Sequence, residues 1–104
     1  MSQFCDFIVD SLQDLGNINI QRMFGGYGLR LEGVFFGIIS DGRLYFKTSQ
    51  ESRKSYEKAG MEPFQPSEKQ TLVSYYEVPV FVIEDHELLC EWATDAIAAQ
   101  IERE

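Results

Sequence analysis

The chain has 104 residues, of which 44% are hydrophobic and 25% are charged, and its formal net charge is −8. This length suits one domain over residues 1–104 with a single core, and the composition excludes a disordered or fibrous protein. The acidic balance disfavours direct DNA binding, because affinity for phosphate comes largely from Lys and Arg side chains.

The first predicted element is an amphipathic helix from Gln3 to Leu15. Ser2 is the expected N-cap and Gly16 is the expected stop signal. The apolar residues of this segment recur at spacings of three and four: Phe4, Ile8, Leu12 and Leu15. One side of the helix should therefore pack on the core.

From Ile18 the pattern changes to alternation with glycine-centred turns, which predicts a β-meander of four strands. Hairpin turns are expected at Glu32-Gly33 and at Asp41-Gly42. The Asp-Gly pair is the stronger signal, because both central residues of a type I′ turn need positive φ and Glu tolerates this less well.

Simple alternation through two-residue turns leaves neither face of this meander polar. An apolar second face must be covered by a helix, a loop or another subunit, so we expect a covered sheet and a possible homodimer. One face is expected to carry Leu29, Leu31, Val34, Phe36, Ile38 and Tyr45, and the other Phe35, Ile39, Leu44 and Phe46.

A second helix is predicted from the capping-box pattern Thr48-Ser49-Gln50-Glu51, with Thr48 as the N-cap and Glu51 bonding back to the cap amide. It should run to about Ala59, with Gly60 as the C′ residue. Two prolines make residues 61–70 a predicted loop.

A further strand is predicted from Val73 to Val78, and the last helix should follow an Asp85 cap. The resulting order, α-β-β-β-β-α-β-α, predicts an α+β fold with an antiparallel sheet and about three helices in two layers. The broad apolar side of the last helix carries Leu88, Leu89, Trp92, Ala93, Ala96, Ile97 and Ile101.

Catalytic, metal and cofactor sites are not predicted. The single histidine, His86, is expected to be an exposed residue in the first turn of the last helix rather than an acid-base catalyst. Cys5 and Cys90 form no CxxC pair and are expected to be reduced thiols. No apolar run is long enough to cross a bilayer and the N-terminus lacks a signal-peptide pattern, so we expect a cytoplasmic protein without membrane contact.

Two segments could bind a ligand. Backbone amides of Gly25-Gly26-Tyr27-Gly28, with Arg22, could hold an anion in a small-ligand or nucleotide sensor, although a tight turn or bulge is the stronger interpretation. Strand tyrosines such as Tyr45 and Tyr76 could stack on bases in a weak nucleic-acid binder. The net charge opposes that alternative, and most aromatic rings are expected in the core or in an interface.

The motifs resemble the TfoX (Sxy) N-terminal domain over nearly the whole chain. The resemblance begins with Arg22-Met23-Phe24-Gly25-Gly26-Tyr27-Gly28-Leu29, followed by Gly33-x-x-Phe36-Gly37 and Asp41-Gly42-Arg43-Leu44-Tyr45-Phe46-Lys47. It continues in Tyr56, Gly60, Pro63-Phe64, Ser74-Tyr75-Tyr76-Glu77-Val78-Pro79 and Trp92-Ala93.

The resemblance implies a curved antiparallel sheet with packed helices, similar in outline to type III secretion chaperones. Proteins of this family regulate natural competence, are thought to act with a cyclic-AMP receptor protein, and have no enzymatic residues attributed to this domain. Full-length competence regulators carry a second, C-terminal domain, whereas this chain ends at Glu104. A protein-binding adaptor is therefore an alternative to competence itself.

The leading hypothesis is a non-enzymatic regulatory module that binds another protein, with transcription machinery as the expected partner class. The candidate partner-binding surface consists of residues in the most specific motifs whose side chains have polar ends. They are Tyr45, Lys47, Tyr75, Tyr76 and Glu77, and the ligand-sensor alternative adds Arg22, Gly25, Gly26 and Tyr27.

Overall fold

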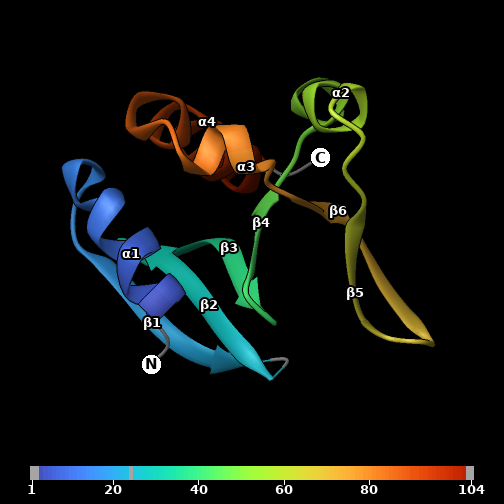
Figure 1. The fold of residues 1–104 in the computed structure, drawn as a ribbon, viewed down its shortest axis with the longest axis horizontal. Coiled ribbons are helices and arrows are strands. Elements are labelled where there is room, and N and C mark those ends of the chain that lie inside the picture. The colour runs from blue at the N-terminus through green and yellow to red at the C-terminus, as the bar shows by residue number, and fades with distance from the viewer. Residues whose placement is uncertain (1–2, 24, 103–104) are drawn as a thin grey trace.

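The computed structural model describes residues 3–23 and 25–102, which form an α+β fold as predicted (Figure 1). Within these residues the strands form one antiparallel sheet of six, in the order β1-β2-β3-β4-β6-β5. The strands are β1 Ile18–Met23, β2 Gly26–Leu31, β3 Val34–Ser40, β4 Arg43–Lys47, β5 Pro63–Ser67 and β6 Gln70–Glu77. The helices are α1 Gln3–Ser11, the 3₁₀ helix η1 Gln13–Leu15, α2 Gln50–Lys58, α3 Val80–Ile83 and α4 His86–Glu102.

The first predicted helix is divided into α1 and η1. The α-helix ends at Ser11 and a 3₁₀ turn continues to Leu15, after which Gly16 ends the segment at φ 136°. The stop at Gly16 is confirmed, whereas the predicted cap Ser2 lies outside the described residues.

Both predicted hairpin turns are confirmed. Glu32 and Gly33 have φ of 51° and 84°, and Asp41 and Gly42 have φ of 55° and 72°. Positive φ at both central residues is the signature of the type I′ turn, which matches the twist of the flanking strands. The β2–β3 hairpin therefore forms even though Glu is a poor residue for this position.

A β-bulge changes which side chains share a face of the sheet. Leu29 pairs with Gly37 and Arg30 pairs with Phe35, so Phe36 is an extra residue in β3. An extra residue reverses the alternation on one side of the bulge relative to the other. The prediction that Leu29, Leu31 and Phe36 share a face with Ile38 and Tyr45 is therefore wrong. These three residues lie on the helix side of the sheet, whereas Phe35 lies on the far side with Ile38 and Tyr45.

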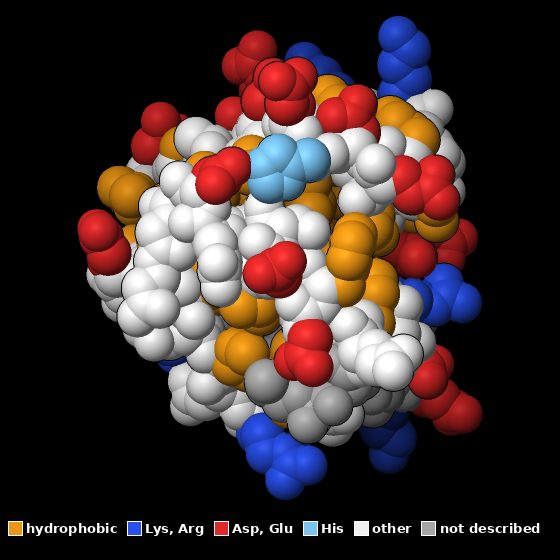
Figure 2. Space-filling view, turned by 60° about the vertical axis from the view of Figure 1, so that its left-hand side comes forward, with side chains coloured by type: hydrophobic (Ala, Val, Ile, Leu, Met, Phe, Trp, Pro, Cys, Tyr) orange, Lys and Arg blue, Asp and Glu red, His pale blue; other side chains and the backbone are white. Residues whose placement is uncertain are grey.

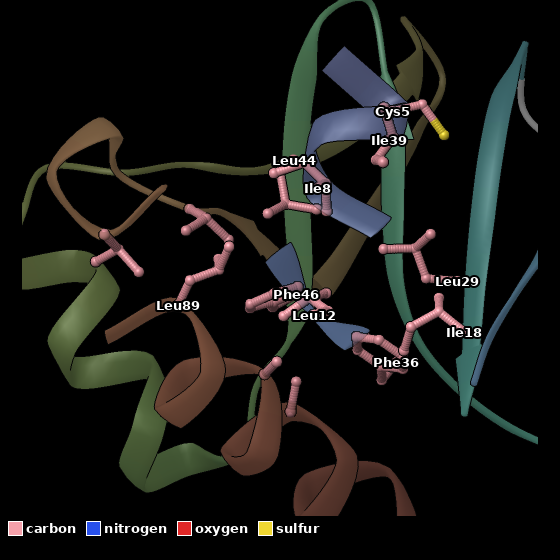
Figure 3. Packing of buried hydrophobic residues seen from close by; sticks show 14 of the residues in the cluster. Cys5, Ile8, Leu12, Ile18, Leu29, Phe36, Ile39, Leu44, Phe46 and Leu89 are labelled. Carbon is pink, nitrogen blue, oxygen red and sulfur yellow. The ribbon is translucent and has the colours of Figure 1, made fainter. Parts of the chain in front are cut away.

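The main core lies between the sheet and helices α1, α3 and α4. Figure 3 shows Ile8 of α1 and Leu12, which follows α1, in the same core cluster as Phe36 and Phe46 of the sheet. Burying a side chain of this size contributes about 1.5–3 kcal/mol. The fully buried members from these elements are Cys5, Ile8, Leu12, Leu29, Phe36, Leu44, Phe46, Val82, Leu89 and Ala93.

A smaller cluster covers the far face of the sheet without any described helix. Ile38, Phe64 and Tyr75 are its buried members, and the rings of Phe64 and Tyr45 lie 4.6 Å apart. The members of this cluster all come from strands of the sheet, so the expected cover by a helix, a loop or a second subunit stays a prediction.

Phe64 belongs to strand β5, in a segment that the prolines predicted to be a loop. That prediction is wrong because β5 is an edge strand that pairs only with β6, and an edge strand tolerates proline on its unpaired side. The expected likeness to type III secretion chaperones stays a prediction.

The capping box of α2 lies one residue later than predicted. Thr48 remains bound to β6, because its amide and its hydroxyl both donate to the Ser74 carbonyl oxygen, at 2.7 and 2.9 Å. Ser49 therefore caps the helix, and its side chain exchanges hydrogen bonds with Ser52. The predicted end is confirmed, with Gly60 at φ 81° after the C-cap.

The C-terminal part contains one more helix than predicted. The short helix α3 follows Pro79, and α4 then begins at His86. Asp85 is confirmed as the cap of α4, because its Oδ1 accepts a hydrogen bond from the Leu88 amide at 3.2 Å. In the part of the chain that is described, no helix is long and apolar enough to cross a membrane.

Candidate functional site

Four of the candidate residues meet on the far face of the sheet, where β4 pairs with β6. The register places Tyr45 opposite Glu77 and Lys47 opposite Tyr75, and directly opposed residues of an antiparallel pair share one face. We refer to these four residues with Arg43, which alternates with Tyr45 and Lys47 along β4, as the β4–β6 surface.

Charged contacts hold this surface together. Nη1 of Arg43 lies 3.1 Å from Oε1 of Glu77, in an ion pair where Arg43 is the more exposed partner. Lys47 Nζ donates to the Ser74 hydroxyl at 3.3 Å and lies 5.7 Å from the centre of the Tyr75 ring. The surface thus presents two cations, one carboxylate and two tyrosines.

The tyrosines of the β4–β6 surface are neutral at physiological pH, and burial raises their pKa values further. It raises the pKa of Tyr75 to about 12, although Arg30 acts in the opposite direction. The pKa of Tyr45 is also raised, by burial and then by the charge of Glu77. Both phenols are therefore available as hydrogen-bond donors rather than as bases.

Tyr76 does not belong to this surface, because it faces the helix side of the sheet. Its hydroxyl donates to Oε2 of Glu57 at 3.3 Å, and its ring lies 6.1 Å from the Tyr56 ring. The guanidinium of Arg53 lies 5.9 Å from the ring centre. Tyr76 therefore connects β6 to α2 and is separated from its sequence neighbours Tyr75 and Glu77 by the sheet itself.

The other candidates lie at the β1–β2 turn. Arg22 pairs with Tyr27, and Gly25 adopts φ 73° in the turn. A Cβ added to Gly26 would collide with the Ile39 carbonyl oxygen, so this glycine allows close approach of β2 and β3. The packing explains this glycine without a ligand, and Phe24 of the same motif lies outside the described residues.

The two groups of candidates are separated within the sheet. Three strand spacings separate β1 from β4 and two separate β2 from β4, which corresponds to about 14 and about 10 Å at the usual distance between neighbouring strands. The nine candidate residues therefore form no single site, and the β4–β6 surface is the larger group.

Sequence reasoning missed two cations near the tyrosines. Arg43 could have been found, since it alternates with Tyr45 and Lys47 in the strand after the Asp-Gly turn. The Glu32-Gly33 turn pairs Arg30 with Phe35, and the guanidinium lies 5.3 Å from the ring centre, but only the bulge places this pair on the same face as Tyr75. Phe35 in turn lies 5.6 Å from Tyr75.

His86 is exposed, as expected, and pairs with a residue remote in sequence. Its Nε2 lies 2.8 Å from Oδ2 of Asp14, and this pair joins η1 to the start of α4. Figure 2 shows the pale blue ring among red carboxylates and exposed hydrophobic side chains. In residues 3–23 and 25–102 there is no group of His, Cys, Asp and Glu side chains suited to a metal ion.

Comparison with known proteins identifies the family. The TfoX N-terminal domain model matches residues 10–100. The chain belongs to the TfoX N-terminal domain family. It is 35% identical over 80 residues to the DNA transformation protein TfoX1 of Aliivibrio fischeri (strain ATCC 700601 / ES114). That match covers 75% of this chain but 38% of the relative, so this TfoX N-terminal domain corresponds to less than half of that protein.

Proposed function

We propose that this TfoX N-terminal domain is a non-enzymatic regulatory module that binds another protein through the β4–β6 surface. The observation that carries the proposal is the register that places Tyr45 beside Glu77 and Lys47 beside Tyr75. Tyrosines are enriched at protein interfaces because they combine a large apolar ring with a polar end. The second face of the sheet offers this combination without a described helix over it.

The regulated process is proposed to be competence, with transcription machinery such as a cyclic-AMP receptor protein as the partner. Family membership and the similarity to a DNA transformation protein support this role. Arg43, Lys47 and Glu77 give the surface both signs of charge, which suits a protein of complementary pattern better than a uniformly negative nucleic acid. A cytoplasmic location is part of the same proposal.

Isothermal titration calorimetry with purified cyclic-AMP receptor protein, loaded with cyclic AMP, tests the proposal. Lys47→Glu reverses a charge at one end of the surface, and we expect at least about tenfold weaker binding, as for loss of one charge-assisted contact. Lys69→Glu makes the same change at an exposed position in the β5–β6 turn and should bind like the unchanged chain.

Equal binding by the two variants would contradict the β4–β6 surface as the interface. Absence of binding at about 100 µM would contradict this partner. A parallel titration of labelled duplex DNA at low and at physiological salt addresses the nucleic-acid alternative, and we expect no binding at physiological salt because the chain has a net charge of −8.

Homodimerisation stays a prediction, and the sheet edges indicate where a second copy would pair. Pro63 and Pro66 lie in the edge strand β5, whereas the opposite edge strand β1 contains no proline. An edge without proline or a bulge can extend into a neighbouring sheet. Light scattering at micromolar concentration should then show about twice the 12.0 kDa monomer mass, and Asn19→Pro in β1 should abolish the increase.

A further inference from the structure

The sheet and the helices of this protein carry charges of opposite sign. The six described strands contain a single carboxylate, Glu77, and four cations, which are Arg22, Arg30, Arg43 and Lys47. Helices α1 and α4 contain Asp and Glu but no Lys or Arg, and the whole chain has a net charge of −8. An acidic molecule is therefore attracted to the sheet and repelled by these helices.

Two cations on the far face of the sheet have only neutral partners. Arg30 Nε donates to Oε1 of Gln21 at 3.2 Å, and Lys47 Nζ donates to the Ser74 hydroxyl at 3.3 Å. Neither side chain forms an ion pair with any residue from 3 to 23 or from 25 to 102. Both positive charges are therefore available to a carboxylate from another molecule.

Aromatic rings connect these two cations. The guanidinium of Arg30 lies 5.3 Å from the centre of the Phe35 ring, and Lys47 Nζ lies 5.7 Å from the centre of the Tyr75 ring. The two rings are 5.6 Å apart. The charge of Arg30 also acts on Tyr75, since it lowers the pKa of this phenol against the effect of burial. We refer to these four residues as the cation–ring cluster.

The rings of the cluster are poorly placed to stack on nucleic-acid bases. Tyr75 is 8% exposed, and the guanidinium of Arg30 lies over the Phe35 ring. Stacking needs an open ring face for each base, and a nucleic acid would also be repelled by the net charge of the chain. The cluster therefore suits separate carboxylates better than a chain of phosphates.

The strand order sets the distance between the two cations. Arg30 lies on β2 and Lys47 on β4, two strand spacings apart, which is about 10 Å. Phe35 lies on β3 between them and is only partly buried, so apolar surface remains to be covered. An extended peptide advances about 3.3 Å per residue, so acidic residues three positions apart span the same distance.

We propose that the cation–ring cluster binds an extended acidic segment of a partner protein. One carboxylate of the segment pairs with Arg30 and another, three residues along, pairs with Lys47, while apolar side chains between them cover the Phe35 ring. The inference rests on the proposed function, because Lys47 and Tyr75 belong to the β4–β6 surface, and it specifies the chemistry of the segment that this surface binds.

Isothermal titration calorimetry with short synthetic peptides tests the inference. The probe is an acetylated and amidated peptide with the sequence Glu-Leu-Phe-Glu, and the matched control peptide is Gln-Leu-Phe-Gln. We expect the glutamate peptide to bind at least about tenfold more tightly, because it makes both ionic contacts. Its binding should weaken between about 50 and about 300 mM salt, whereas binding of the control should not.

Variants of the chain locate the site. Arg30→Gln and Lys47→Gln should each weaken binding of the glutamate peptide about tenfold, and Arg30→Lys should retain most of the affinity because it keeps the charge. Lys54→Gln removes a positive charge from an exposed position in α2 and should leave binding within about twofold. Thermal unfolding confirms that each variant is folded.

Failure of the inference is distinguishable from failure of the proposed function. No binding of the glutamate peptide at about 1 mM would overturn the inference, even if the cyclic-AMP receptor protein binds and Lys47→Glu weakens that binding. Peptide binding in the absence of receptor-protein binding would support the inference and contradict the partner named above.

Three further results would also overturn the inference. The first is equal binding of the glutamate and glutamine peptides, which would indicate apolar contact alone. The second is an equal effect of Lys47→Gln and Lys54→Gln. The third is tighter binding of a single-stranded thymidine oligonucleotide than of the glutamate peptide, which would identify the far face as a nucleic-acid interface.

Discussion

The two faces of the sheet are built from similar residues but are covered differently. The helix side buries leucine, isoleucine and phenylalanine from α1, α4 and four strands in one continuous core. The far side buries Ile38, Phe64 and Tyr75 and partly covers Phe35, Tyr45 and Leu72, all of them from strands. The first face lacks charged residues in its core, whereas Arg30, Arg43 and Lys47 surround the second.

This difference separates stability from recognition. Side chains enclosed by helices make contacts on all sides, so their removal leaves a cavity. Side chains on the far face contact one another and solvent, and their polar ends remain available to a partner. We therefore expect changes on the helix side to affect folding and changes on the far side to affect binding.

The neighbours Phe46 and Tyr45 offer the largest contrast, because they point to opposite faces of β4. Phe46→Ala should lower the free energy of unfolding by about 3–5 kcal/mol, as for a fully buried ring. Tyr45→Ala removes a partly covered ring and should cost about 1–2 kcal/mol. Urea denaturation of both variants measures the difference. Equal losses would show that the far face contributes as much to stability as the helix side.

Two glycines of β2 compare a rigid obstacle with an adjustable one. Gly26→Ala places a methyl group against the Ile39 carbonyl oxygen and should cost about 3 kcal/mol, because the paired backbone cannot move aside. In Gly28→Ala the obstacles are the Met23 sulfur and the edge of the Phe35 ring, which can shift on the open face, so we expect about 1 kcal/mol. A larger cost for Gly28→Ala in thermal unfolding would mean that the far face is rigid.

The start of α2 gives a smaller effect. Ser49→Ala removes the observed N-cap and should cost about 1 kcal/mol. Glu51→Gln leaves the capping box intact and should cost less than about 0.5 kcal/mol. Chemical denaturation distinguishes the two. A larger cost for Glu51→Gln than for Ser49→Ala would support the capping box predicted from Thr48 and Glu51.

The contribution of the far face to stability should also depend on pH in the alkaline range but not near neutral pH. The pKa of Tyr75 is raised to about 12 in the folded protein and is about 10 in an unfolded chain. The unfolded state therefore loses its proton first, and the contribution of Tyr75 to stability is present below pH 10 and is lost as the pH rises towards 12. Thermal unfolding of Tyr75→Phe should match the unchanged chain at pH 8 and decline less at pH 11. An identical decline would contradict burial of this phenol.

Local sequence signals determined most elements of this fold. The Asp41-Gly42 turn, the Gly60 end of α2 and the Asp85 cap appear where predicted, because backbone conformations of this kind depend on one or two residues. The double apolar pattern of the meander also indicated that apolar side chains would lie on both faces of the sheet. Of the candidate site, the sequence indicated the residues of β4 and β6 but not their arrangement.

Tertiary structure decided the remaining features. The bulge at Phe36 arises from the pairing of β2 with β3, and no local motif marks it. Thr48 stays out of the helix because Ser74, 26 residues away, accepts its hydrogen bonds. Alternation along β6 separates Tyr76 from Tyr75, but only the β4–β6 pairing joins Lys47 to Tyr75. Which side chains share a surface depends on the register between distant strands, and register is set by packing of the whole core rather than by neighbours in the sequence.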